Sequence, residues 1–289
     1  MATPEPRHVA GETIPSLGPL YQDIRDTMQI SWVPDVFSAL GEVPGYLTFA
    51  WKQLNPSVET AQFVRLAEQV QKDAVAAVRS LYVPSYDVGD VQQVGVPLEQ
   101  QAEIRTALAA LMFGHSQTLL AVKALRLAIE GSPPGGRKRI SWPRSATTWA
   151  MQPIPDVDEA TVGQRVRDVF TEAREALRLP RVPWSFRVIA PWPRYLQLAW
   201  GDLIGVAHEP EFAAAQSELV EQAPALCDLF PARVDVTPER LAMKGQSIFQ
   251  IQRARAILRS YDRLLPTDLL LTACLRYPLG GDSVISTRS

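Results

Sequence analysis

The sequence is short of the residues on which disulfide-rich and metal-binding proteins depend. It holds only two cysteines and three histidines in 289 residues. Cys227 and Cys274 lie far apart and form no CxxC pair, so neither a disulfide framework nor a zinc site is predicted. We expect both thiols to be buried. The composition, with 46% hydrophobic and 21% charged residues, is typical of a folded globular chain.

The sequence also lacks an excess of positive or negative charge. Lys and Arg number 29 and Asp and Glu number 31, and the formal net charge of −2 gives no general attraction to nucleic acid or anionic lipid. The start of the chain has no apolar core of signal-peptide length, and the apolar stretches elsewhere are too short or too interrupted to cross a bilayer. We therefore expect a cytoplasmic protein without nucleic acid or membrane partners. A small-molecule substrate, argued from the cleft described below, and a second copy of the chain in a homo-oligomer stay as candidate partners.

What the sequence does contain is an internal similarity. Residues 33–54 and 182–203 align without a gap at an offset of 149, with nine identities in 22 positions. The identical pairs are Val33/Val182, Pro34/Pro183, Phe37/Phe186, Pro44/Pro193, Tyr46/Tyr195, Leu47/Leu196, Ala50/Ala199, Trp51/Trp200 and Leu54/Leu203. Most are apolar, so we expect them to be packing residues, Trp51 and Trp200 among them.

Helical spacing dominates the rest of the chain. The apolar residues of 37–54 recur every three or four positions around a proline, which predicts helix, proline break, helix. Four further ranges are rich in helix formers at helical spacing, and no long run alternates with period two. These ranges are 58–81, 98–129, 210–230 and 238–274. The predicted fold class is therefore all-α.

The predicted organisation is two homologous helical repeats that pack about a pseudo-two-fold axis, with a ligand cleft between them. We expect a flexible N-terminus at 1–18, one repeat at 19–130, a linker rich in Pro and Gly at 131–160, and a second repeat at 161–289. The basic cluster Arg137 to Arg139 is interpreted as solvated loop. Differences between the repeats should mark the functional site.

The duplicated pattern, SWVPDVF and PGYLTFAW in one half and FRVIAPWPRYL in the other, resembles the group I 2-haloacid dehalogenases. This group is also labelled the halocarboxylic acid dehydrogenase family. Residues 111–125 and 260–281 extend the resemblance over nearly the whole chain. It implies an all-helical pseudo-dimer that removes halide from D- and L-2-haloacids between its repeats. In that family an aspartate activates water for direct displacement, without an ester intermediate, and the resemblance implies no metal or organic cofactor.

Carried over residue by residue, the resemblance places Trp32 and Tyr261 on an active-site tryptophan and tyrosine. Pro34, Thr118 and Trp184 are expected beside them in the substrate pocket, Trp184 where the family has serine. Ser185 occupies the position of the water-activating aspartate, and a serine hydroxyl is not basic near neutral pH. Asp35 replaces a family aromatic residue and His115 a family asparagine.

Three interpretations follow for the catalytic candidates Asp35, His115 and Ser185. Asp35 can take over as the base from the other side of the pseudo-two-fold axis. The three residues together have the composition of a nucleophilic triad, although no G-x-S-x-G elbow is present. The chain can also bind a small molecule without dehalogenating it.

Each candidate has a structural alternative. Asp35 and Ser185 follow prolines and precede apolar helical runs, as helix N-caps do. His115 lies on an otherwise apolar helix, where a half-buried imidazole with satisfied hydrogen bonds is common.

Overall fold

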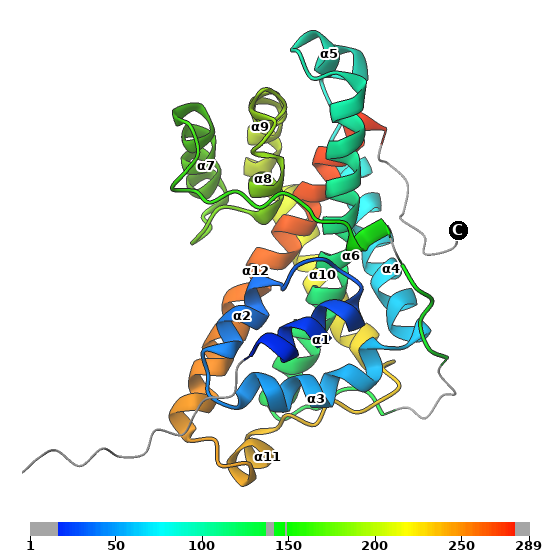
Figure 1. The fold of residues 1–289 in the computed structure, drawn as a ribbon, viewed down its shortest axis with the longest axis vertical. Helices are drawn as coiled ribbons and strands as arrows, with labels where there is room; N and C mark the ends of the chain where they lie inside the picture. The colour runs from blue at the N-terminus through cyan, green and yellow to red at the C-terminus, as the bar shows by residue number, and fades with distance from the viewer. Residues whose placement is uncertain (1–16, 137–141, 148, 281–289) are drawn as a thin grey trace, which may run out of the picture.

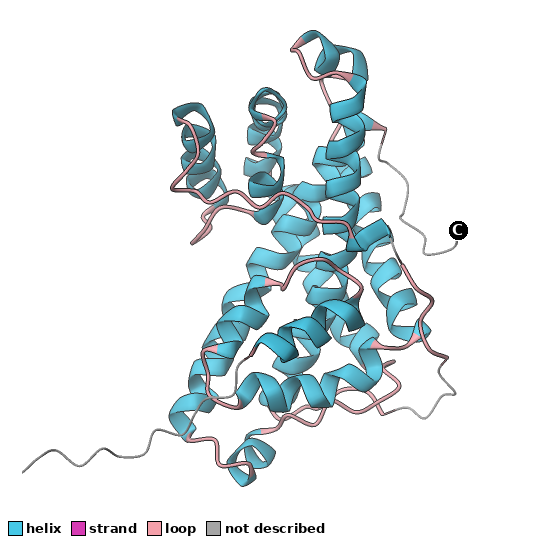
Figure 2. Cartoon of the chain, in the orientation of Figure 1, coloured by secondary structure: helices cyan, strands magenta, loops and turns pink. Residues whose placement is uncertain are grey.

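The computed structural model describes residues 17–136, 142–147 and 149–280. Within these ranges the chain is all-α, as predicted; it has no β-strand, and Thr60 and Pro143 form an isolated bridge (Figure 2). The predicted flexible N-terminus, except its last two residues, and the cluster Arg137 to Arg139 lie outside the described residues. The helices are α1 (Gly18–Met28), α2 (Asp35–Gly41), α3 (Tyr46–Val58), α4 (Ala61–Leu81), α5 (Val88–Gln93), α6 (Leu98–Ile129), η1 (Trp149–Met151), α7 (Gln164–Leu177), α8 (Trp184–Ile189), α9 (Pro193–His208), α10 (Pro210–Cys227), α11 (Pro238–Met243), α12 (Ile248–Arg276) and η2 (Tyr277–Leu279).

Polar side chains fix where several helices begin. The Asp87 carboxylate accepts the N–H groups of Gly89 and Asp90, at 2.7 and 3.1 Å, at the start of α5. Ser247 and Gln250 form a capping box at the start of α12. Each cap satisfies backbone donors that the first turn of a helix leaves free. Local chemistry therefore sets these boundaries in addition to apolar spacing.

The two longest helices, α6 and α12, pack against each other at the centre of the fold, with α4 and α10 beside them (Figure 1). Every residue of α12 from Leu264 to Arg276 is buried. One hydrophobic cluster runs from Ile24 to Leu279 and takes residues from both halves of the chain. Cys227 and Cys274 are buried and free, as predicted.

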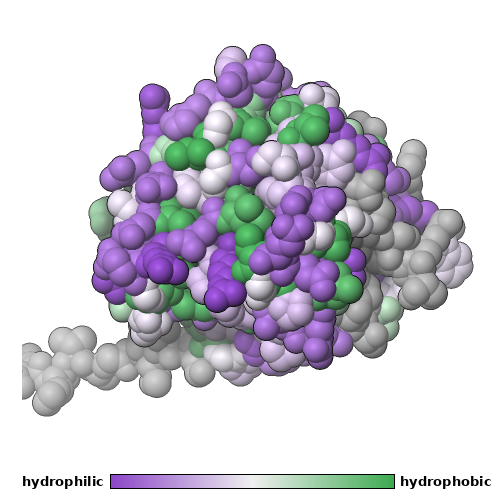
Figure 3. Space-filling view, turned by 90° about the horizontal axis from the view of Figure 1, so that it is seen from above, coloured by the Kyte–Doolittle hydropathy of each residue, from purple (hydrophilic) through white to green (hydrophobic). Residues whose placement is uncertain are grey.

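Helix α6 corrects one expectation about apolar stretches. It is long and apolar enough to cross a membrane by length and composition, with a mean hydropathy of 1.3 in its most apolar window. However, 89% of that window is buried inside the molecule, as in the core helix of a soluble protein. On the face seen from above, hydrophilic residues surround smaller hydrophobic groups (Figure 3).

Several local features recur at the 149-residue offset. Trp51 donates its indole N–H to Asp23 at 2.6 Å, and Trp200 donates to Glu172 at 3.1 Å. The two indoles are 3% and 2% exposed, so their predicted packing role is confirmed. Their partner rings also correspond, since Phe37 lies 5.8 Å from Trp51 and Phe186 lies 5.5 Å from Trp200.

The backbone carries the same correspondence. Gln29 ends α1 with a φ of 56° and Arg178 ends α7 with a φ of 51°. These are the only non-glycine residues with positive φ in the described ranges. Left-handed backbone at a helix C-terminus usually takes glycine. Gln29 and Arg178 depart from that preference at positions 149 residues apart, so the two helices end in the same way.

The linker packs more closely than a surface loop. Ala150 is fully buried, and the Arg144 guanidinium donates to the carbonyl of Thr27 at 2.8 Å and to Gln117 Oε1 at 2.9 Å. Burial lowers the pKa of Arg144 to about 10. This part of the predicted linker therefore holds α1 against α6.

Candidate active site

A small cavity lies where the N-termini of α2 and α8 meet the middle of α6 and α12. Its volume is about 20 Å³, which is room for about one water molecule. It is lined by Pro34, Asp35, Val36, His115, Thr118, Arg181, Val182, Trp184, Tyr261, Leu264, Leu265 and Asp268. Six of the eight predicted site residues line it; Trp32 and Ser185 do not.

Asp268 is the carboxylate that holds α8 in place. Its Oδ2 accepts the N–H of Trp184 at 2.8 Å, and its Oδ1 accepts the N–H of Ser185 at 3.0 Å. A negative charge at a helix N-terminus also interacts favourably with the helix dipole. Asp268 is only 4% exposed although it lies on an apolar stretch of α12.

This arrangement corrects the expected N-cap roles. Pro34 and Pro183 occupy the N-cap positions of α2 and α8, and neither helix has a side-chain cap hydrogen bond from its N-cap residue. Both prolines have extended backbone, so Asp35 is the first residue of α2 and Ser185 the second of α8. At α8, Asp268 from the distant helix α12 does the capping that was expected of Ser185.

Ser185 is fully buried, and its Oγ has no hydrogen-bond partner within the described part of the chain. The predicted triad needs a hydrogen bond between that hydroxyl and the His115 imidazole. Ser185 Oγ makes no such bond in this conformation. The Ser185 backbone, held by Asp268, contributes more to the site than its hydroxyl does.

His115 reaches the cavity from α6. It is 2% exposed, its Nε2 lies 3.8 Å from Asp268 Oδ2, and its Nδ1 has no hydrogen-bond partner among the described residues. Burial lowers the pKa of His115 below its usual 6.5; the carboxylates of Asp268 and Asp35 oppose the shift, and Arg187 adds to it. The imidazole is therefore neutral near pH 7 and can accept a proton.

Asp35 lies at the exposed edge of the cavity between two arginines. Its Oδ2 is 3.6 Å from Arg181 Nη1 and 3.4 Å from Arg187 Nη2. Arg181 also donates to the Tyr261 hydroxyl at 3.2 Å, and its guanidinium lies 5.5 Å from the centre of that ring. The edge of the cavity thus carries two cations and one anion.

Trp184 forms the apolar wall of the cavity, and Trp32 supports it without lining the cavity. Trp184 packs edge-on against Trp32, with ring centroids 5.2 Å apart, and lies 5.8 Å from the His115 ring. The indole N–H groups of both tryptophans have no hydrogen-bond partner among the described residues. Gly114 makes this packing fit, because a Cβ there would lie 2.4 Å from Trp32 Cζ2.

The other predicted residues have ordinary surroundings. Burial raises the pKa of the Tyr261 hydroxyl, against the opposing charge of Arg181, so the phenol stays protonated. Thr118 donates to the carbonyl of Gly114 at 2.8 Å, one turn back on α6. Among the described residues, no group of three or more His, Cys, Asp or Glu side chains could hold a metal ion.

Sequence reasoning missed Arg181, Arg187 and Asp268. The first stands 149 residues after Trp32, so the comparison of halves that singled out Asp35 could also have found it. Asp268 is the only charged residue in LLPTDLLLTACL, and a lone acid in such a run is rarely buried without a partner. Its contact with α8 depends on how the helices cross, which spacing does not give.

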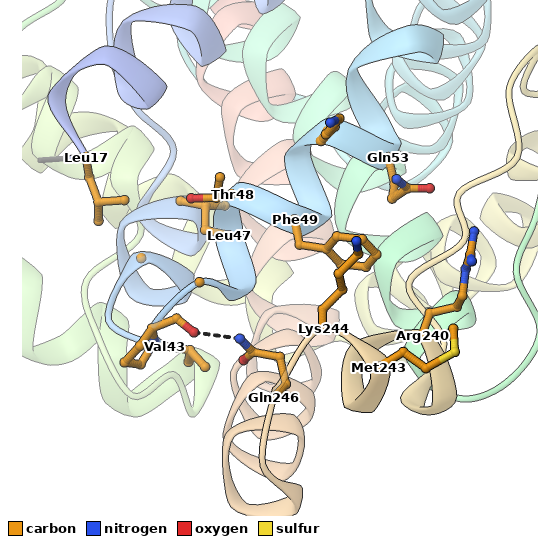
Figure 4. Close-up of a pocket in the computed structure, with 14 residues that line it drawn as sticks. Leu17, Val43, Leu47, Thr48, Phe49, Gln53, Arg240, Met243, Lys244 and Gln246 are labelled. Atoms are coloured by element: carbon orange, nitrogen blue, oxygen red, sulfur yellow. Dashed lines mark hydrogen bonds between the residues drawn. The ribbon is translucent and has the colours of Figure 1, made fainter. Parts of the chain in front are cut away.

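A larger cavity, of about 570 Å³, lies between the start of α3 and α11 (Figure 4). Lys52, Arg240 and Lys244 reach it, and Gln246 closes one side by donating to the Pro44 carbonyl at 2.8 Å. No Asp, Glu or His is among the residues that line it. It therefore has no group to activate water, and the smaller cavity is the candidate active site.

Solved structures share this fold. A D-2-haloacid dehalogenase mutant, its complex with D-2-CPA, and a D-2-haloacid dehalogenase with L-LA each superpose with a TM-score of 0.86. Each comparison covers 96% of both chains at 22% sequence identity. The helical arrangement is thus that of the D-2-haloacid dehalogenase structures.

Sequence comparisons agree with the fold. An (R)-2-haloacid dehalogenase of Pseudomonas putida is 23% identical over 267 residues, which cover 91% of this chain and 87% of that relative. A configuration-inverting 2-haloacid dehalogenase of Alcaligenes xylosoxydans xylosoxydans is 25% identical over 256 residues, covering 81% and 83%. The sequence model of one family, Halocarboxylic acid dehydrogenase DehI, matches residues 31–182. The chain belongs to this halocarboxylic acid dehydrogenase family, in agreement with the resemblance seen in its sequence.

Proposed function

We propose that this protein hydrolyses 2-halo acids in the cavity between α2, α6, α8 and α12. One observation carries the proposal: the cavity brings a substrate-binding cation, Arg181, together with three acid–base groups, Asp35, His115 and Asp268. The named activities of the relatives, all 2-haloacid dehalogenases, agree with it.

The substrate carboxylate fits the exposed edge of the cavity. Arg181 offers a guanidinium beside the protonated Tyr261 hydroxyl, and a guanidinium can bind a carboxylate through two parallel hydrogen bonds. Trp184 then faces the carbon chain of the acid. The unpartnered indole N–H group of Trp184, which lines the cavity, is a donor for the departing halide.

The reaction needs one water molecule and one base. The water oxygen forms a bond to C2 of the acid as the carbon–halogen bond breaks, and the electron pair leaves with the halide. The base takes the proton of the water, so the products are a 2-hydroxy acid and halide. No cofactor enters this balance.

The cavity must widen for this chemistry, because a three-carbon acid occupies several times about 20 Å³. Its exposed edge is the place to open, since the Arg181 side chain is 46% exposed and the Asp35 side chain 33%. Both side chains can turn outward without disturbing the buried wall.

We also propose that the site lies on the pseudo-two-fold axis of two repeats, 19–130 and 161–289. Support comes from the helix order, since α1 to α6 and α7 to α12 correspond one to one, with starts 149 or 150 residues apart in four pairs and 146 or 147 apart in α1/α7 and α3/α9. The paired tryptophans and the two left-handed C-caps give further support. Helices α5 and α11 lie at opposite ends of the molecule (Figure 1).

A second candidate function is binding of a small acid without dehalogenation. It is favoured by Ser185, which stands where the resemblance expects the activating aspartate and whose hydroxyl has no hydrogen-bond partner among the described residues. A hydrolase that uses Asp35, His115 and Ser185 as a triad needs Ser185 to turn toward His115.

Halide release from each enantiomer of 2-chloropropionate tests the proposal. We expect chloride and lactate in equal amounts from the wild type. Arg181→Gln should raise KM about 10- to 100-fold through loss of a charge-assisted hydrogen bond. Arg165→Gln, on the exposed side of α7, is the matched control. Binding of the acid without chloride release would support the second candidate function.

A further inference from the structure

His115 and Asp268 face the same cavity from opposite helices. The 3.8 Å between His115 Nε2 and Asp268 Oδ2 is too long for a direct hydrogen bond. A water molecule within hydrogen-bond distance of both atoms fits this separation, and the cavity has room for about one. The pair is therefore arranged to hold a water between an imidazole and a carboxylate.

The two groups are not equivalent as bases. Asp268 already accepts two backbone N–H groups, at 2.8 and 3.0 Å, so both of its oxygens are engaged at the start of α8. His115 Nδ1 has no hydrogen-bond partner among the described residues, Nε2 faces Asp268 at 3.8 Å, and the ring is neutral near pH 7 because it is buried. The imidazole is the group with a free lone pair.

We propose that His115 is the catalytic base of this chain and that Asp268 is its positioning residue. This inference rests on the proposed dehalogenation and assigns the base within it. The water oxygen attacks C2, the halide leaves with the bonding electron pair, and the water proton goes to His115 Nε2. The tautomer that acts carries its own proton on Nδ1. His115 returns the proton to solvent before the next turnover.

The charges around the ring suit this step. The imidazolium that forms faces Asp268 on α12 and Asp35 on α2, while Arg187 on α8 opposes it. Arg181 and Tyr261 line the same cavity nearer its edge. The carboxylates thus stabilise the charge that develops during proton transfer, and Asp268 also fixes the start of α8, which carries Trp184.

The first test is His115→Asn, which keeps a polar side chain but has no base. We expect kcat for 2-chloropropionate to fall about 100-fold or more with KM little changed, since substrate binding depends on Arg181. His208→Asn, at the exposed end of α9, is the matched control and should retain wild-type kcat. A kcat for His115→Asn close to that of wild type overturns the assignment.

A second measurement needs no variant. In the wild type, kcat/KM should fall with acid along a limb whose pKa is below 6.5 and matches the titration of the His115 imidazole in NMR. An acid limb that does not follow the His115 titration overturns the proposal. This measurement decides the matter even if His115→Asn does not fold.

Asp268→Asn separates positioning from capping. Because Asp268 raises the pKa of His115, its removal should shift the acid limb to lower pH and reduce kcat about 10-fold or more. A variant that is only less stable, with an unmoved limb, would show Asp268 to be a helix cap alone. If the wild type releases no halide from any 2-halo acid, the proposed function fails; if it does and His115→Asn is fully active, only this inference fails.

Discussion

On one wall of the cavity, α2 and α6 contribute Asp35, His115 and Thr118. On the facing wall, α8 and α12 hold Trp184, Leu265 and Asp268 at positions 149 or 150 residues later. An acid thus stands opposite an indole, an imidazole opposite an isobutyl group, and a hydroxyl opposite an acid. Neither wall alone has both a base and the carboxylate that positions it.

Away from the cavity the comparison reverses. Tyr46 and Tyr195 are both fully buried, and Leu47 and Leu196 both lie in the core. Residues that pack are alike in the two halves, whereas most residues that line the cavity differ, with Pro34 and Val182 as the exceptions. The two halves therefore share a frame of similar core residues that can hold two unlike cavity walls at a fixed distance. Such an arrangement keeps a base and a substrate-binding cation apart.

The largest expected effect comes from giving Gly114 a side chain. Its counterpart in the second half, Leu264, already has one. We expect Gly114→Ala to lower the free energy of unfolding by about 1–3 kcal/mol, because its methyl group would overlap the rigid Trp32 ring. Urea unfolding measures this. The matched control is Gly201→Ala on the exposed side of α9, where a Cβ meets nothing within 4 Å and should stabilise the helix by about 0.5–1 kcal/mol. Equal effects at the two glycines would mean that Trp32 can move aside.

A smaller effect tests the likeness of the frame. Trp51→Phe and Trp200→Phe each remove one indole hydrogen bond to a carboxylate and keep an aromatic ring beside Phe37 or Phe186. We expect each to cost about 1 kcal/mol of unfolding free energy, and the double variant to cost the sum. Strong non-additivity would show that the two positions are coupled through the shared core.

Much of this frame could be predicted from the sequence. Apolar spacing gave the helices, and the identical positions identified Trp51 and Trp200 as core residues. The resemblance placed Asp35, His115 and Trp184 at one cavity. Asp268 could not be placed, because its role depends on the crossing of α12 over α8. The capping expected of Asp35 and Ser185 was wrong, because the preceding prolines take the N-cap positions and shift both residues into the first turn.

The smallest expected effect is that of Asp35→Asn, and it distinguishes His115 from Asp35 as the catalytic base. Asp35→Asn removes one of the two carboxylates that raise the pKa of His115, and the lesser of them. With His115 as base, the pKa of the imidazole falls further, so the acid limb of kcat/KM moves to lower pH while kcat at neutral pH stays within the same order of magnitude.

The opposite result has an equally clear signature in the same assay. If Asp35 is the base, Asp35→Asn abolishes halide release at every pH, because an amide cannot accept the water proton. Since Asp35 also pairs with Arg181, KM measured beside kcat separates altered substrate binding from loss of the base. A limb that moves with kcat preserved assigns the base to His115 on α6, and a complete loss assigns it to Asp35 on α2.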